Sequence, residues 1–258
     1  MDNTIGDITG YIDVAQVVLY VFWVFFAGLI IYLVKENKRE GYPLDSDRTN
    51  SRVSVIGWPE PPDPKTYRTA QGETITAPTG VGDSRPIKAE PAAKWPGAPL
   101  VPTGENPMLD GVGPGAYAER KDQPDLTNDG TPKLVPNRIA SDFHVDERDP
   151  NPVGMEVVGF DGKVGGKITE IWIDRAEHLI RYLELDTGGE NGSVLLPMTM
   201  ARISGGKVKV ASIKGEHFAD VPKIKNPDQV TRLEEEKITA YYAAGHLYAD
   251  PSRSEPLL

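Results

Sequence analysis

The segment "IDRAEHLIR" contains the residues whose types and spacing come closest to a chemical site. It places Asp174, Glu177 and Arg181 around one predicted strand–turn–strand. A carboxyl group that is buried near a like charge has a raised pKa and can bind and release protons near neutral pH. The same residues could instead form a solvated turn, where a surface ion pair contributes well under about 1 kcal/mol.

Other catalytic or metal chemistry finds little support in the sequence. Cysteine is absent, which excludes disulfides, thiolate nucleophiles and cysteine-ligated metal sites. No serine lies in a nucleophile motif, and "GVGPGA" lacks the spacing of a dinucleotide loop. The four histidines, none at metal-ligand spacing, are His144, His178, His217 and His246. We therefore predict neither a metal site nor a catalytic site, and the carboxylates remain the only candidates.

Composition limits the class of partner. The chain has 258 residues, enough for one or two domains, and a formal net charge of -10. A nucleic-acid backbone requires a basic surface, so nucleic acid is not an expected partner. With 39% hydrophobic and 26% charged residues, most of the chain is typical of a water-soluble protein.

The N-terminal region departs from that composition. Residues 14–34, "VAQVVLYVFWVFFAGLIIYLV", carry no charge, and a helix needs roughly 20 such residues to cross a bilayer. A cleaved signal peptide would have a basic start and a shorter apolar run, whereas this start is acidic. A buried core helix is a second alternative. The sequence favours one transmembrane helix over residues 12–34.

Basic residues follow the apolar run directly. Residues 1–34 contain no Lys or Arg, and then come Lys35, Lys38 and Arg39. The positive-inside rule predicts residues 1–11 outside, which is the periplasm if the membrane is a bacterial inner membrane, and the large C-terminal part in the cytoplasm. We expect the three basic residues at the membrane surface, in contact with anionic lipid headgroups.

The stretch after the span is rich in proline. Residues 45–150 hold 16 of the 23 prolines, which makes long helices and central strands improbable there. The alternatives are a disordered linker and an extended chain that lies flat on another surface. Scattered aromatic and aliphatic residues favour the second. That surface could be the chain's own domain or a partner subunit. We expect residues 35–105 to be an extended, Pro/Gly-rich membrane-surface or linker region.

The pattern changes to short strands in the C-terminal part, which we expect to form a cytoplasmic domain over residues 106–258. Segments such as "KITEIWID" and "SVLLPM" alternate with turn signals, and "ARISGGKVKVA" predicts a hairpin with Gly205-Gly206 at the bend. This indicates a small barrel or sandwich over about 150–222. In "HLIRYLELD", strand alternation puts Arg181 on one face with Leu179, Leu183 and Leu185.

One soluble helix is predicted near the C-terminus. Residues 227–244 form it, with Asn226 as the N-cap, Pro227 in the first turn and Gly245 at the end. The acids of "LEEEK", residues 233–237, are expected to pair with basic residues of the proline-rich stretch.

Several segments together resemble one family. "KREGYPLD" (38–45) directly follows the span, and the others come in order along the chain: "NPMLDGVGPGAYAER", "KLVPNRIASDFHV", "EIWIDRAEHLIRYLEL", "LLPM" and "QVTRLEEEKITAYYAAGHLYA". The ordered set resembles the H subunit of the photosynthetic reaction centre of purple bacteria. The resemblance implies a membrane-anchored, mainly β protein, with one N-terminal transmembrane helix, an extended surface segment, a small cytoplasmic PRC-type β-barrel and one C-terminal helix.

The resemblance also implies a role and partners. Such a subunit has no catalytic site of its own, caps the quinone sites of the L and M subunits on the cytoplasmic side, and conducts protons to the secondary quinone. It binds no cofactor directly; bacteriochlorophyll, bacteriopheophytin, quinones and non-haem iron belong to the partner subunits. A cytochrome subunit, a light-harvesting antenna and membrane lipids are further partners. The implied location is the bacterial inner, intracytoplasmic (chromatophore) membrane.

Site residues follow by position. Glu177 resembles the internal proton-transfer residue of the family, with Asp174 coupled to it and Arg181 offsetting the charge. Some members carry two histidines at the proton entrance, where this chain has Asp129 and Thr131. Asp122, Asp125 and Asp129 are therefore the candidates for the entrance. The alternative function, from another class, is a membrane-tethered adaptor that uses a PRC-like barrel to recruit a soluble partner.

Overall fold

The computed structural model describes residues 7–9, 12–40, 42, 57–70, 72–79, 83–95, 97–189 and 192–254. The chain divides into two compact units, Met1–Ser84 and Arg85–Leu258. Arg85, at the start of the second unit, contacts Tyr117 of the same unit. The Arg85 guanidinium lies 4.5 Å from the ring centroid of Tyr117 and donates a 3.0 Å hydrogen bond to the Tyr117 carbonyl.

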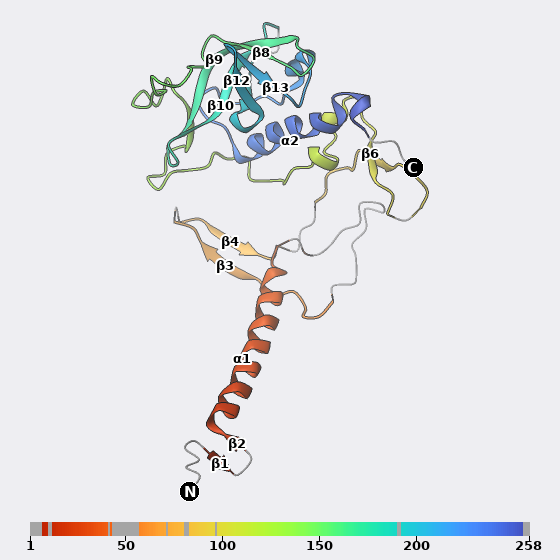
Figure 1. The fold of residues 1–258 in the computed structure, drawn as a ribbon, viewed down its shortest axis with the longest axis vertical. Coiled ribbons are helices and arrows are strands. Elements are labelled where there is room, and N and C mark those ends of the chain that lie inside the picture. The colour runs from red at the N-terminus through yellow and green to blue at the C-terminus, as the bar shows by residue number, and fades with distance from the viewer. Residues whose placement is uncertain are drawn as a thin grey trace. The chain divides into compact units, whose positions relative to one another are not determined.

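The first unit contains the apolar helix α1, Val14–Asn37 (Figure 1). Asp13 caps its start, since the Asp13 carboxylate accepts a 2.7 Å hydrogen bond from the Gln16 amide. None of the helix side chains is buried, and the helix is long and apolar enough to cross a membrane. It ends three residues beyond the predicted limit of Val34, because the polar residues that follow continue the helical turn.

Among the described residues, three pairs of short antiparallel strands lie outside the main sheet. In the first unit, β1 (Asp7–Thr9) pairs with β2 (Ile12–Asp13), and β3 (Lys65–Arg68) pairs with β4 (Thr74–Ala77). In the second unit, β5 (Ala89–Pro91) pairs with β6 (Leu100–Pro102). The region predicted to be an extended segment therefore contains local β structure among its described residues.

A seven-stranded sheet forms the centre of the second unit. Its strands are β7 (Leu134–Pro136), β8 (Glu156–Val158), β9 (Val164–Asp174), β10 (Leu179–Asp186), β11 (Ser193–Pro197), β12 (Ala201–Ser204) and β13 (Lys207–Val210). The order is β11-β10-β9-β8-β13-β12, and β7 pairs with β9. Only the β13–β8 pair is parallel. Because β9 is the longest strand, β8 pairs with its first half and β7 with its last three residues.

The sheet has the mainly β character that was predicted, but it is not closed by a continuous hydrogen-bond ladder. Its outer strands, β11 and β12, are not paired with each other in the described chain. A 3₁₀ turn, Met198–Met200, joins them directly. The hairpin predicted at Gly205-Gly206 is confirmed: both glycines have positive φ, of 63° and 71°, as a two-residue type I′ turn requires.

Helix α2, Arg232–Tyr248, packs on the apolar core of this sheet (Figure 1). Ile238, Tyr241 and Tyr242 are at most 1% exposed and follow the helical spacing that lines one face. The largest other side chains of the core include Trp172, Phe218, Leu183 and Leu195.

The predicted ends of this helix were wrong. Thr231, not Asn226, is the N-cap: its hydroxyl accepts from the Glu234 amide at 3.2 Å, and Glu234 accepts from the Thr231 amide at 2.9 Å. This capping box fixes the start five residues later than Pro227. Gly245 does not end the helix. A Cβ there would lie 2.4 Å from Ile213 Cγ2, so glycine permits close packing inside the helix.

Candidate functional site

The tight turn between β9 and β10 is organised by Asp174. One oxygen of its carboxylate, Oδ1, accepts hydrogen bonds from the amides of Ala176 and Glu177 at 3.0 and 2.9 Å. The His178 amide donates to the Asp174 carbonyl at 2.8 Å, and His178 takes the left-handed conformation with φ of 55°. An Asp side chain that binds the amides two and three residues ahead stabilises such turns. The turn therefore holds Glu177 at a fixed distance from Asp174.

Lys133 joins the two carboxylates. Its Nζ lies 3.3 Å from Asp174 Oδ2 and 3.1 Å from Glu177 Oε1. The Asp174 contact is an ion pair without the alignment of a hydrogen bond. Asp174 is fully buried, whereas the Glu177 side chain is 48% exposed. Two of the three predicted residues thus lie together, one reaching solvent and the other inside the protein.

The charge of Lys133 is stabilised by this arrangement. Partial burial lowers the pKa of Lys133, but the interactions with Glu177 and Asp174 outweigh it, and the net pKa is raised. Strand pairing brings Lys133 to the site: Leu134, the next residue, lies opposite Asp174 in the β7–β9 register. The sequence-based prediction missed Lys133, because the two residues it joins are far from it in the chain.

Arg181 lies at a β-bulge, not in a regular strand. Ile180 pairs with Ile173 and Tyr182 pairs with Trp172, so Arg181 is the extra residue between them. The bulge breaks the alternation that was predicted to align Arg181 with leucines 179, 183 and 185. Tyr182 and Leu183 are both buried, whereas Leu179 is 39% exposed. Arg181 is only partly buried, and its charge acts on the neighbouring carboxyl group of Glu235.

Glu235 of α2 is the functional candidate that the sequence-based prediction did not find. It is partly buried and accepts a 2.9 Å hydrogen bond from the Tyr182 hydroxyl. Burial raises the pKa of Glu235, and Asp125 adds to the rise, while Tyr182, Arg181 and Lys133 oppose it. The net shift is upward. Glu235 is therefore coupled electrostatically to residues of the predicted site.

Helical spacing contained a signal for Glu235. It precedes the buried residues Ile238 and Tyr242 by three and seven positions, so it lies on the inner face of α2. The prediction that the acids of "LEEEK" pair with basic residues of the proline-rich stretch is confirmed for Glu236, whose Oε1 lies 2.9 Å from Arg120 Nε. Glu234 instead serves the capping box described above.

The three candidates for a proton entrance lie in different surroundings. Asp122 forms an ion pair with Lys225 and accepts a 2.8 Å hydrogen bond from the Thr231 hydroxyl. The Lys225 interaction is the main cause of the lowered pKa of Asp122. Asp125 lies 3.9 Å from Arg232, and its negative charge contributes to the raised pKa of Glu235. Asp129 is exposed on a turn. Of the three, Asp125 is the one whose charge reaches the inner carboxyl group.

A second charged cluster lies on the same two strands. Glu170 and Glu184 are directly opposite each other in the β9–β10 register. Arg138 lies 3.8 and 3.9 Å from them and 2.8 Å from Asp228. The Trp172 indole donates to Glu184 at 2.9 Å. Like charges directly opposite each other in a sheet are destabilising, so Arg138 and the indole have a structural role here.

The predicted lipid-contacting residues of the first unit differ in accessibility. Lys35 is exposed. Lys38 is buried and donates a hydrogen bond from its Nζ to the Pro59 carbonyl. Arg39 forms an ion pair with Glu36, with 2.6 Å between Nε and Oε2. Of the three residues, Lys35 is thus the exposed one. Lipid contact by these residues stays a prediction.

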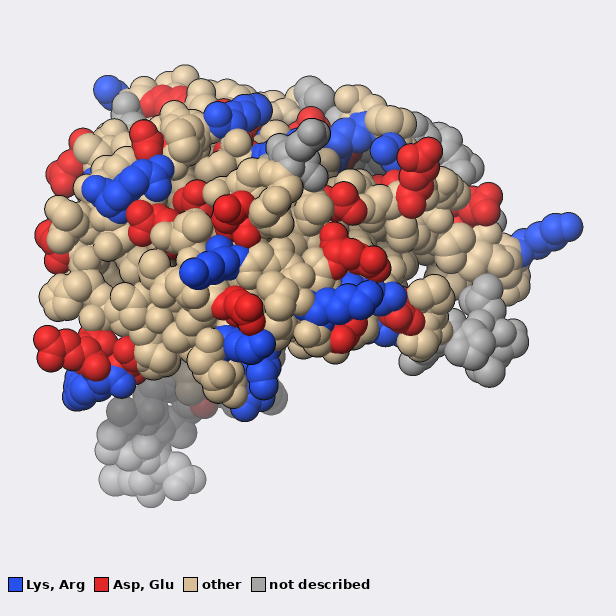
Figure 2. Space-filling model, turned by 90° about the horizontal axis from the view of Figure 1, so that it is seen from above, with Lys and Arg blue, Asp and Glu red and all other residues tan. Residues whose placement is uncertain are grey.

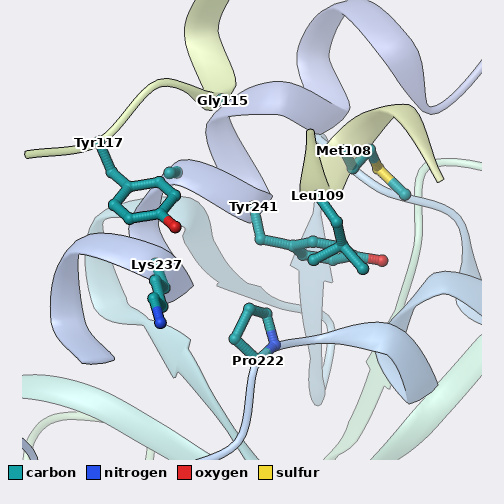
Figure 3. A pocket seen from close by; sticks show the side chains of 8 residues that line it. Met108, Leu109, Gly115, Tyr117, Pro222, Lys237 and Tyr241 are labelled. Atoms are coloured by element: carbon teal, nitrogen blue, oxygen red, sulfur yellow. The ribbon is translucent and has the colours of Figure 1, made fainter. Parts of the chain in front are cut away.

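A small pocket lies beside α2 (Figure 3). Its volume is about 200 Å³. The residues around it include Met108, Leu109, Tyr117, Pro222, Lys237 and Tyr241. Lys237 is two residues from Glu235, so the two side chains point in different directions from the helix. The pocket is separate from the carboxyl cluster.

The charged residues at the surface are mixed in sign. Figure 2 shows a face on which acidic and basic side chains are interspersed. The net charge of -10 is thus not gathered into one acidic patch on that face. In the part of the chain that the structure describes, no group of three or more His, Asp or Glu side chains is placed to hold a metal ion.

Comparison with known families identifies the chain. The model of the photosynthetic reaction centre H-chain N-terminal region matches residues 6–139, which is more than half of the sequence. The chain belongs to the H-chain family of photosynthetic reaction centres. The PRC-barrel domain model matches residues 144–217, which include β8 to β13. The resemblance noted in the sequence is thereby confirmed, including its mainly β fold class with one apolar helix in front.

Family membership sets the general role of this H subunit. H chains are structural subunits of a photosynthetic complex, so this chain works together with other subunits. The apolar helix α1 and the family together indicate membrane anchoring. A free-standing adaptor, the alternative considered from the sequence, is not favoured by this assignment.

Proposed function

We propose that this H subunit covers the quinone sites of its complex on the cytoplasmic side and conducts protons to the secondary quinone. The observation that carries the proposal is the bridge from half-exposed Glu177 through Lys133 to fully buried Asp174. A quinone that accepts two electrons must also take up two protons at a place removed from water. Carboxyl groups at hydrogen-bond spacing can transfer protons to such a place.

Each residue has a distinct part in this proposal. Glu177 takes a proton from solvent and releases it inward, toward the buried Asp174. Lys133 and Arg181 keep the cluster from accumulating unbalanced negative charge. Glu235, with its raised pKa, belongs to the same coupled group. Protons are then bound by the cluster as a whole, with apparent pKa values that belong to no single residue.

The proposal includes a setting for the subunit. The partners would be the L and M subunits, with a cytochrome subunit and an antenna as further companions. Bacteriochlorophyll, bacteriopheophytin, quinones and non-haem iron would be bound by those partners. We place the N-terminus in the periplasm and the second unit in the cytoplasm, at the inner membrane of a purple bacterium, following the positive-inside rule. The subunit would carry no catalytic site of its own.

Glu177→Gln tests the proton-conducting role in the assembled complex. The amide keeps the size of the side chain but cannot release a proton. We expect slower proton uptake coupled to the second electron transfer, with unchanged pigment absorption as the control for intact assembly. Flash-induced absorbance of a pH-indicator dye would measure this. Unchanged kinetics of quinol formation in the variant would remove Glu177 from the route.

A further inference from the structure

The β3–β4 hairpin of the first unit has two chemically different faces. Residues that are paired across the strands share a face. The pairs on one face are Tyr67–Ile75 and Lys65–Ala77. The pairs on the other are Thr66–Thr76 and Arg68–Thr74. The first face is apolar with one lysine, and the second is hydroxylated and charged, so the hairpin is amphipathic.

The apolar face is not covered within the described part of the unit. Tyr67 is 45% exposed and Ile75 is 40% exposed, although they lie directly opposite each other. Nearby in the chain, Trp58 is 74% exposed. A two-stranded hairpin is marginally stable in water and needs a further surface for its apolar side. This face therefore requires a partner.

The hairpin is fastened to the C-terminal end of α1. One guanidinium nitrogen of Arg39, Nη1, donates to the carbonyls of Asp63 and Ala77 at 2.7 and 3.0 Å. Lys65 Nζ lies 3.2 Å from Glu36 Oε1, in the last turn of the helix. The hairpin thus lies at the depth where α1 ends, and in Figure 1 it extends sideways from that end.

The apolar face is the one turned toward the helix. Lys65, on that face, contacts Glu36, as described above. Lys65 and Tyr67 are two residues apart on β3 and share this face. Because Lys65 reaches Glu36 in the last turn of α1, the face that carries Tyr67 is directed toward the helix.

We propose that the β3–β4 hairpin lies in the headgroup region of the bilayer, with Tyr67 and Ile75 directed toward the acyl chains. Aromatic residues are favoured at that depth, and an amphipathic element there satisfies its apolar and its polar face at once. Exposed Lys35 at the same helix end provides positive charge toward phosphate groups. The proposal rests on α1 as the membrane anchor and not on proton conduction.

A pair of single-cysteine variants tests the proposal, because the chain has no cysteine of its own. Ile75→Cys places a spin label on the apolar face, and Thr76→Cys places one on the opposite face, one residue further along. The labelled full-length subunit is studied in its complex, in bilayers of phosphatidylcholine and phosphatidylglycerol. The unmodified chain, treated in the same way, gives the background from other subunits.

The readout is the accessibility of each label to oxygen, which concentrates in lipid, and to a water-soluble nickel chelate. We expect a ratio of oxygen to nickel accessibility that is several-fold higher at position 75 than at position 76. A label at 75 that is immobile and shielded from both reagents would overturn the proposal in favour of a protein partner. Equal, nickel-rich accessibility at both positions would overturn it in favour of water. Neither outcome would change the kinetics expected for Glu177→Gln.

Discussion

Tyr182 on β10 donates a 2.9 Å hydrogen bond to Glu235 on α2, and this contact joins the sheet and the helix at a carboxyl group with a raised pKa. Burial is the main cause of the rise, and the Tyr182 hydroxyl partly offsets it. The same environment raises the pKa of Tyr182 itself, again mainly through burial. A protonatable group is thus held between two packed elements, where its position is fixed by both.

Glu235→Gln should reveal this raised pKa as a pH-dependent stability. In the folded chain Glu235 binds its proton more tightly than its ordinary value of 4.5 implies, so ionisation above that pH costs stability. Wild type and the Gln variant should therefore differ least in acid. The advantage of Gln should grow as the pH rises through the raised pKa and then level off.

Urea unfolding of the full-length chain in detergent, followed by tryptophan fluorescence, measures that difference. Glu236→Gln is the matched control, since Glu236 pairs with Arg120 at the surface. It should show no such growth with pH. A constant difference between wild type and Glu235→Gln across the pH range would contradict the raised pKa.

Lys133→Met should be strongly destabilising. It removes the cation from Asp174, which is 0% exposed, and a buried charge left unpaired costs roughly 3 kcal/mol or more. Adding Asp174→Asn should restore part of the loss, because Asn keeps an oxygen for the turn amides and carries no charge. Thermal unfolding of the single and double variants gives the coupling energy.

Lys163→Met, at a 71% exposed side chain, is the control and should change the free energy of unfolding by less than about 0.5 kcal/mol. Additive single effects would rule out the pairing.

Gly245→Ala should destabilise the protein, although alanine is the better helix former by about 1 kcal/mol. The new methyl group would meet Ile213 Cγ2 at 2.4 Å and the Ser212 carbonyl oxygen at 2.7 Å. Overpacking of this kind costs roughly 1–3 kcal/mol. His246→Ala, at the neighbouring exposed position, should be nearly neutral in the same thermal unfolding experiment. A stabilised Gly245→Ala variant would show that α2 can move away from that contact.

The features that the sequence predicted well depend on local patterns. The apolar run of α1 and the Gly205-Gly206 hairpin are readable because their determinants lie within a few residues. The ends of α2 were missed because two signals competed: Asn226-Pro227 and the Thr231–Glu234 capping box both mark a helix start. The box satisfies two backbone donors reciprocally and decides the start.

The candidate site was only partly predictable for a similar reason. Asp174 and Glu177 share a turn, so sequence proximity brings them together. Lys133 reaches them through the β7–β9 register, and Glu235 reaches the site through packing of α2 on β10. Such contacts between distant segments leave no spacing pattern in the chain. The bulge at Arg181 arises from pairing with β9 and could not be read from β10 alone.

Arg39 joins the C-terminal end of α1 to the chain that follows it, and this limits how α1 can rotate. A lone apolar helix in a bilayer can spin about its long axis, since every azimuth presents similar side chains to the lipid. Two carbonyls of the adjoining loop and hairpin, from Asp63 and Ala77, are bound to the same guanidinium that pairs with Glu36. Because the helix and the hairpin are joined in this way, the two would turn about the helix axis together and not independently.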